Sequence, residues 1–167
     1  PERVILFETA SNTSSVSAEW TIIDGVADYF EVNCSDGRPA RQRTLFSEAF
    51  TATCSGIESG KTVNISVTAM SGKKRGETMT LAITTYPERV KLFETVSNTS
   101  SVSAEWTIID GVADYFEVNC SDGRPAHQRM LFSDAFTATC SGIESGRTVN
   151  TCVTAMSGKK RGETMTL

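Results

Sequence analysis

The chain contains the same sequence twice. "PERVILFET" begins at Pro1 and returns as "PERVKLFET" at Pro87, and the offset of 86 residues then holds to Leu167. This period is longer than the roughly 20–50 residues of a solenoid repeat, but it suits an independently folding domain. We therefore expect two domains, residues 1–86 and residues 87–167, the second with a shortened last strand. The eight differing positions among the 81 compared are Ile5/Lys91, Ala10/Val96, Arg41/His127, Thr44/Met130, Glu48/Asp134, Lys61/Arg147, Ile65/Thr151 and Ser66/Cys152.

Within each copy the apolar residues recur with a period of two. Residues 16–20 read Val-Ser-Ala-Glu-Trp, and the same alternation returns at residues 30–34 and 63–69. Alternation of this kind is typical of a strand with one buried face. Turn-forming stretches such as "IIDGVAD", "SDGRPA", "ESGK" and "SGKKRGE" separate these segments. Short strands at this spacing predict a β-sandwich.

Composition narrows the classes of partner. The net charge is −4, which disfavours a nucleic-acid role because phosphate binding requires a basic surface. No apolar run approaches 18 residues, so we expect no membrane insertion by this fragment. The chain has no initiator Met and no signal-like apolar start, and we expect it to be a piece of a longer tandem array whose neighbouring repeats are partners.

The residues of each copy resemble the fibronectin type III family. The resemblance rests on the Trp of the second strand and on "SGIESGKTVNISVTAMSG", in which Gly56–Val63 matches the family's Gly-Leu-x-Pro-Gly-x-x-Tyr corner. Ser59 replaces the usual Pro, and Val63 replaces the corner Tyr, so we expect another interaction to compensate for that missing hydroxyl. The resemblance implies an all-β chain of two tandem immunoglobulin-like (fibronectin type III) seven-strand β-sandwiches. The style of the repeats also resembles the ectodomain arrays of vertebrate receptor-type tyrosine phosphatases.

Each copy has two cysteines twenty residues apart, Cys34/Cys54 and Cys120/Cys140. The resemblance places their strands in opposite sheets, so the two thiols of a copy would face each other across the core. A disulfide there would add about 3 kcal/mol by loop entropy and would compensate for the missing corner Tyr. The alternative is a pair of buried free thiols. A metal site is disfavoured because His127 is the only histidine and no Cys-x-x-Cys spacing occurs.

Cys152 has no counterpart in the first copy, where Ser66 occupies its position. Its parity predicts an outward side chain, whereas Thr151 takes the buried place of Ile65. We expect a free surface thiol, and the alternative is a disulfide to a second molecule. No base lies near it in sequence, and we expect no catalytic residues, metal or cofactor.

Glycosylation sequons recur in register in the two copies. Their Asn residues are predicted to lie outward or in loops, and together with the paired cysteines they indicate an extracellular protein, secreted or part of a membrane-protein ectodomain. Asn12, Asn64 and Asn98 are the preferred sites, since a disulfide-bonded Cys follows Asn33. Asn150-Thr151-Cys152 is a degenerate version. The five predicted sites are Asn12, Asn33, Asn64, Asn98 and Asn119.

The loop "SGKKRGET" occurs in both copies and is strongly basic. The resemblance places it between the last two strands, at the end of the sandwich shared with loops at about residues 21–28 and 44–49. Its cluster could bind heparan sulfate or an acidic protein surface, and the alternative is a solvated loop. Arg-Gly-Glu resembles the Arg-Gly-Asp of integrin ligands, but the longer Glu alters the geometry at the integrin's cation, so integrin binding is rejected. The candidate residues are Lys73, Lys74, Arg75, Lys159, Lys160 and Arg161.

These observations predict a non-catalytic spacer or adhesion module in the ectodomain of a cell-surface receptor. The junction "TTYPERV" is short and contains one Pro, so the two domains would form a semi-rigid rod. A protein or glycosaminoglycan ligand would bind the basic loops. The alternatives are ancillary extracellular domains of a receptor enzyme, such as a tyrosine phosphatase, or a secreted matrix protein with homophilic association.

Overall fold

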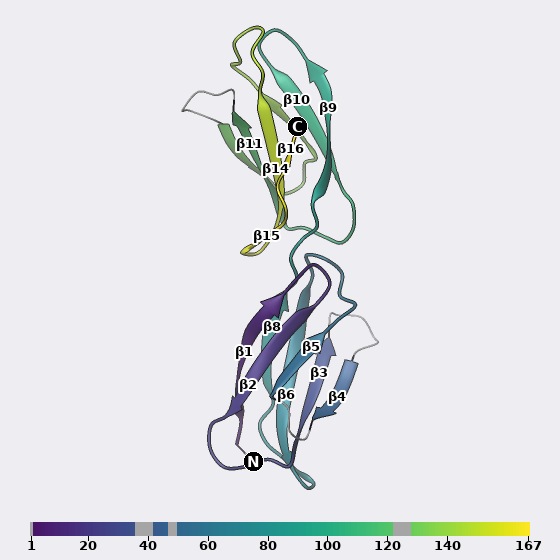
Figure 1. The fold of residues 1–167 in the computed structure, drawn as a ribbon, viewed down its shortest axis with the longest axis vertical. Helices are drawn as coiled ribbons and strands as arrows, with labels where there is room; N and C mark the ends of the chain where they lie inside the picture. Colours follow the sequence, from purple (N-terminus) through teal and green to yellow (C-terminus); the bar gives the residue numbers. More distant parts are fainter. Residues whose placement is uncertain (1, 36–41, 47–49, 122–127) are drawn as a thin grey trace. The chain divides into compact units, whose positions relative to one another are not determined.

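The computed structural model describes residues 2–35, 42–46, 50–121 and 128–167, and at residues 42–46 and 128–129 it describes the backbone alone (Figure 1). His127 lies outside the described residues. The chain divides into two compact units, unit 1 at Pro1–Thr85 and unit 2 at Tyr86–Leu167. The described residues form strands and no helix that is long and apolar enough to cross a membrane.

Unit 1 is built from two antiparallel sheets. One sheet has the order β1-β2-β5, and the other has the order β4-β3-β6, with β7 and β8 both paired to the far side of β6. β7 and β8 are two segments of one last strand, so the sandwich has the seven strand positions expected from the sequence. The strands are β1 (Val4–Ser11), β2 (Val16–Ile22), β3 (Tyr29–Ser35), β4 (Gln42–Phe46), β5 (Thr51–Cys54), β6 (Thr62–Ser71), β7 (Lys74–Arg75) and β8 (Met79–Thr84).

Unit 2 repeats this topology with a shorter edge. Its sheets have the orders β13-β10-β9 and β12-β11-β14, with β15 and β16 paired to the far side of β14. β16 contains two residues where β8 contains six, and β14 has eight residues where β6 has ten. The strands are β9 (Val90–Ser97), β10 (Val102–Ile108), β11 (Tyr115–Ser121), β12 (Gln128–Phe132), β13 (Thr137–Cys140), β14 (Asn150–Ser157), β15 (Lys160–Arg161) and β16 (Met165–Thr166).

The alternating residues meet between the two sheets of each unit, as the period of two predicts. Trp20 packs against Phe30 with 5.6 Å between ring centroids, and Trp106 packs against Phe116 at 5.7 Å. Full burial of one such large apolar side chain stabilises a fold by about 1.5–3 kcal/mol. The buried cluster of unit 1 contains Val4, Val16, Ala18, Trp20, Phe30, Val32, Cys34, Cys54, Ile57, Val63, Ile65, Val67, Ala69 and Ile83. That of unit 2 contains Val90, Trp106, Phe116, Val118, Ala138, Val153 and Ala155.

Two features differ from the sequence-based prediction. Residues 44–46 of the loop expected at 44–49 are strand, because β4 continues to Phe46 in register with β3, and residues 47–49 lie outside the described residues. Glu31, predicted to be exposed by its parity on β3, is buried to 8% exposure, and Glu117 is buried to 7%. Both carboxylates lie on the outer face of a sheet, where the arginine of the neighbouring hairpin covers them.

Candidate interaction surface

The basic loop of unit 1 is a tight hairpin. β6 pairs with β7 through Ser71 and Lys74, which leaves Gly72 and Lys73 as the two turn residues. Gly72 has a φ of +59°, the sign that a type II′ turn requires at its first central position and that side-chain-bearing residues rarely adopt. Gly158 has the same φ in unit 2. The predicted turn is therefore two residues long, and Arg75 lies in the strand that follows it.

The loop after β2 holds this hairpin in place. A carboxylate oxygen of Asp28 accepts a hydrogen bond from the backbone N–H of Gly72 at 2.9 Å, and the Asp28 N–H donates to the carbonyl of Met70 at 2.8 Å. Asp114 makes the equivalent bonds to Gly158 and Met156, both at 2.7 Å. The loops at residues 21–28 and 71–78 thus share one end of the sandwich, as predicted. Asp28 and Asp114 therefore anchor the two hairpins.

The arginines of the two hairpins are bound within their own units. Arg75 Nη1 lies 3.1 Å from Glu31 Oε2, whereas Arg161 contacts both carboxylate oxygens of Glu117, at 3.2 and 3.3 Å. The hydrogen bond to Glu117, followed by the negative charge of that carboxylate, raises the pKa of Arg161 above its usual value. The backbone N–H of Gly76 donates to the carbonyl of Ala69 at 2.9 Å. Arg75 and Gly76 therefore lie along the sheet edge, and the tip of the loop is formed by Gly72 and Lys73.

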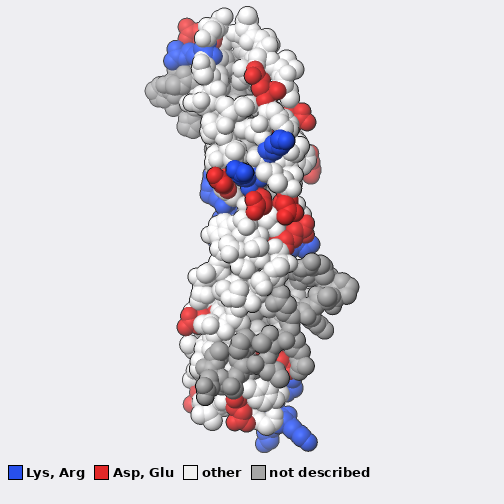
Figure 2. Space-filling view, turned by 45° about the vertical axis from the view of Figure 1, so that its right-hand side comes forward, with Lys and Arg blue, Asp and Glu red and all other residues white. Residues whose placement is uncertain are grey.

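The lysines of the two hairpins have different surroundings. Lys73 and Lys74 are exposed and form no ion pair with another described residue. In Figure 2, Lys and Arg side chains gather at the lower end of unit 1, where Figure 1 draws the turn after β6. In unit 2 Lys159 is exposed, but Lys160 is half-buried with its ammonium 4.7 Å from the ring centre of Tyr86. The predicted cluster is thus an open lysine pair in unit 1 only.

Residues 86–88 lie against the hairpin of unit 2. A Cβ added to Gly162 would stand 2.7 Å from the Pro87 carbonyl oxygen and 3.2 Å from that of Glu88. Only glycine allows so close an approach of two backbones, since any side chain would meet immobile carbonyl groups. The Gly of Arg-Gly-Glu in unit 2 therefore makes room for the chain that enters β9.

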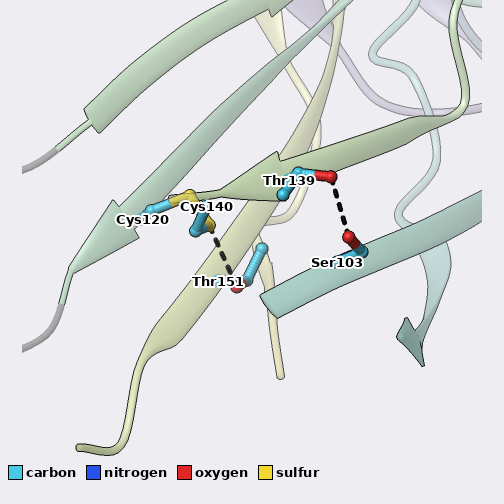
Figure 3. The surroundings of a disulfide bond; sticks show 5 residues. All are labelled: Ser103, Cys120, Thr139, Cys140 and Thr151. Atoms are coloured by element: carbon cyan, nitrogen blue, oxygen red, sulfur yellow. Dashed lines mark hydrogen bonds between the residues drawn. A yellow bond between two sulfur atoms is a disulfide. The ribbon is translucent and has the colours of Figure 1, made fainter. Parts of the chain in front are cut away.

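The cysteines of each unit form a disulfide between the two sheets. Cys34 on β3 is bonded to Cys54 on β5 with 6.1 Å between Cα atoms, and Cys120 on β11 is bonded to Cys140 on β13 with 5.9 Å. Figure 3 shows the second bridge. Both Cα distances lie in the range that unstrained disulfides use.

The substitutions beside this disulfide change its surroundings in unit 2. Thr151 occupies the core position of Ile65 at 4% exposure, and its Oγ1 lies 3.7 Å from Cys140 Sγ (Figure 3). Cys152 is a half-buried free thiol on the outer face, and its Sγ lies 3.3 Å from Thr166 Oγ1. In unit 1 the same outer position holds Ser66, bonded to Thr80 at 3.0 Å.

The corner before β6 is closed by Thr85 in unit 1, a role that no sequence motif revealed. The Thr85 hydroxyl donates to the Glu58 carbonyl at 2.8 Å and accepts from the Lys61 N–H at 3.0 Å. The Thr85 N–H also donates to the Lys61 carbonyl at 3.0 Å. These bonds are made next to Val63, which lies where the sequence resemblance expects a corner Tyr.

The predicted glycosylation residues fall into three environments. Asn12 and Asn98 are exposed in the turns that precede β2 and β10. Asn64 is exposed on β6, and the degenerate Asn150 is exposed on β14. Asn33 and Asn119 are half-buried, and their side-chain nitrogens donate to Glu31 and Glu117 at 3.3 and 3.1 Å.

No group of three or more His, Cys, Asp or Glu side chains within the described residues is arranged to hold a metal ion. A surface hollow in unit 2 is lined in part by Val102, Ala104, Val149 and Leu167. In unit 1 the counterpart of Val149 is Val63, which pairs with Ile83 of β8.

Comparison with known proteins places the fold among tandem modules. No protein-family model matches the sequence. A two fibronectin type III domain segment from chicken tenascin superposes with a TM-score of 0.69, at 13% identity over 98% of this chain and 95% of the other. The FN1–FN3 domains of chicken CNTN1 give a TM-score of 0.42, at 13% identity over 100% of this chain and 67% of the other. The tenascin segment shares the fold across both units.

Proposed function

We propose that this chain, which carries the fibronectin type III fold twice in tandem, is a non-catalytic extracellular spacer module that restricts the motion of one unit against the other. The observation that carries the proposal is the anchoring of the junction. Thr85, the last residue of unit 1, is bonded to the backbone of Glu58 and Lys61 in that unit. The next residue, Tyr86, lies under Lys160 of unit 2.

Anchored residues follow one another directly at this junction, which supports a short and restricted connection. A flexible linker extends as the square root of its length, and each added residue enlarges the volume that the tethered domain samples. Pro87 removes a further backbone freedom by fixing its own φ, and it disfavours helical conformations at Tyr86. A spacer requires this property, because a module that holds distal domains at a set separation must not bend freely.

The two disulfides support the extracellular setting, since such bonds persist in oxidising compartments. A small sandwich outside the cell gains about 3 kcal/mol from each bond in the loop-entropy account.

The experiment is a measurement of domain motion in the intact chain by NMR relaxation and residual dipolar couplings. We expect the couplings of both units to fit one alignment tensor. A variant with Gly-Ser-Gly-Ser inserted between Thr85 and Tyr86 is the matched control, and its units should need two separate tensors. Independent tensors for the unaltered chain would overturn the proposal.

A second function, the binding of an acidic ligand, is favoured by the open lysine pair of unit 1. Lys73 and Lys74 are exposed and adjacent, so they present two charges to a sulfated glycosaminoglycan or an acidic protein. The test is salt-dependent retention on heparin of the Lys73→Ala/Lys74→Ala variant, with Lys159→Ala/Lys160→Ala as control. Arg75 is left intact because it neutralises the buried Glu31. We expect Lys73→Ala/Lys74→Ala to elute at lower salt than the unaltered chain and the control variant to elute unchanged. Unchanged elution of Lys73→Ala/Lys74→Ala would contradict binding of an acidic ligand by this lysine pair.

A further inference from the structure

The side-chain amides of Asn12 and Asn98 are held in one orientation by the turns in which they lie. Asn12 Oδ1 accepts hydrogen bonds from the backbone N–H groups of Ser14 and Ser15, each at 2.8 Å. Asn98 Oδ1 accepts the same two bonds at 2.9 and 2.8 Å. Two backbone N–H donors require an acceptor, so the atom that faces them is the amide oxygen Oδ1 and the other is the nitrogen Nδ2. Nδ2 then points away from the turn, and both residues are exposed.

The same turns bring the hydroxyl of the sequon next to the amide. Ser14 Oγ lies 3.4 Å from Asn12 Oδ1, and Ser100 Oγ lies 3.4 Å from Asn98 Oδ1. All of these bonds join residues no more than three positions apart. Turns of this kind are local and need no tertiary contact.

Asn33 and Asn119 have the opposite arrangement. The nitrogen of each, which a glycan would modify, donates to a nearly buried glutamate. That glutamate is also the partner of Arg75 or Arg161. A sugar on Nδ2 would remove the bond and would require space beside a sheet face that the arginine already covers. Each asparagine is also followed by a cysteine of a disulfide.

We propose that Asn12 and Asn98 are acceptor sites for N-linked oligosaccharides and that Asn33 and Asn119 carry none in the folded protein. The donor is a polyprenyl pyrophosphate-linked oligosaccharide. Nδ2 forms a bond to the anomeric carbon of the first sugar, the bond from that carbon to the pyrophosphate breaks, and the amide proton passes to a base of the transferase. The inference rests on the extracellular setting in the proposed function.

The position of these sites has a structural consequence. Asn12 follows β1 and Asn98 follows β9, so each glycan would lie at the end of the sandwich away from the basic hairpin. The lysine pair of unit 1 is then left accessible, and the glycan shields the exposed turn before β2 instead.

The test is glycopeptide mass spectrometry of the full chain secreted from animal cells behind a cleavable leader. Peptides from the two copies differ in mass and can be distinguished. Those with Asn12 or Asn98 differ at Ala10/Val96, and those with Asn33 or Asn119 differ at Arg41/His127. We expect Asn12 and Asn98 to be occupied in most molecules and Asn33 and Asn119 to be unoccupied. Ser14→Ala should remove the first glycan and leave the second as an internal control, since backbone N–H groups and not the Ser14 hydroxyl make the turn.

A secreted, disulfide-bonded chain without glycans on Asn12 and Asn98 would overturn the inference, as would equal occupancy at Asn33 and Asn119. The spacer proposal is tested separately, because the residual dipolar couplings are measured on a chain produced without glycans. A negative result in one experiment therefore does not affect the other.

Discussion

The corner before β6 and its counterpart before β14 have almost the same sequence and different surroundings. Both contain Ser-Gly-Ile-Glu-Ser-Gly, yet Ser59 is 4% exposed in unit 1 whereas Ser145 is exposed in unit 2. Val63 is fully buried and Val149 only half-buried. In unit 1, β8 and Thr85 lie over the corner. In unit 2, β16 pairs with β14, and Leu167 pairs with Thr151.

The comparison shows that burial at this corner is decided by a distant strand and not by the local residues. The same hexapeptide is thus buried to different extents, since Ile57 is buried and Ile143 only half-buried. Lys74 and Lys160 also occupy equivalent positions, and Lys160 lies over the ring of Tyr86. Substitutions in one unit, compared with the matched positions of the other, test how far these contacts set the stability of each unit.

The largest effect is expected from the disulfides. The double variant Cys120→Ala/Cys140→Ala should lower the free energy of unfolding of unit 2 by about 3 kcal/mol, because the unfolded chain regains the entropy of a loop of 20 residues. Cys34→Ala/Cys54→Ala should cost unit 1 a similar amount.

Hydrogen exchange measures the amide protection of the two units separately, because the peptides from residues 61–66 and 147–152 differ in mass. Equal protection of both peptides in the Cys120→Ala/Cys140→Ala variant would contradict the prediction.

The next effect comes from exchanging the core residue beside the disulfide. Ile65→Thr should destabilise unit 1 by about 2 kcal/mol, because it removes apolar volume and buries a hydroxyl without a strong acceptor. Thr151→Ile should stabilise unit 2 by about 1 kcal/mol, since unit 1 accommodates Ile65 at 0% exposure. Urea titration followed by hydrogen exchange gives both values. A loss of stability in Thr151→Ile would show that the two cores are packed differently.

A smaller effect is expected at the corner itself. Thr85→Val keeps the shape of the side chain and removes its hydroxyl, so it should cost unit 1 about 1 kcal/mol through the lost bonds to Glu58 and Lys61. Unit 2 should be unaffected. Thr84→Val, which removes an exposed hydroxyl bonded to Thr62, is the matched control and should change little. Equal costs for the two variants would mean that the corner does not depend on Thr85.

The smallest effect distinguishes the two arginines. Arg161→Lys should destabilise its unit more than Arg75→Lys, by less than about 1 kcal/mol, because only the guanidinium of Arg161 contacts both oxygens of its partner. Folding raises the pKa of Arg161, so its stabilisation is complete below the unfolded-state pKa and is lost only as pH rises through the higher folded value.

Unfolding titrations between neutral pH and about pH 10 should therefore show no loss from Arg161, which stays charged throughout that range. A decline confined to unit 2 within that range, abolished by Arg161→Lys, would contradict the assignment.

Much of this fold could be predicted from the sequence, because a period of two is a local signal. The alternation at residues 16–20 identified β2 and its buried Trp20, and the resemblance to fibronectin type III placed Cys34 opposite Cys54. Contacts between strands far apart in sequence were missed. The bond from Arg75 to Glu31 joins residues 44 positions apart, and nothing around either residue marks the other as its partner. The role of Thr85 also depends on a corner 24 to 27 residues away.

The disulfides have a mechanical consequence for a chain under tension. A covalent bond survives forces that separate the sheets, so the residues between Cys34 and Cys54 stay in a closed loop when unit 1 is pulled apart. The cysteines are separated by 20 residues, and at about 3.5 Å per residue each loop withholds roughly 70 Å of extension. A stretched array of such repeats would lengthen in short steps and stop well before the length that its residue count implies.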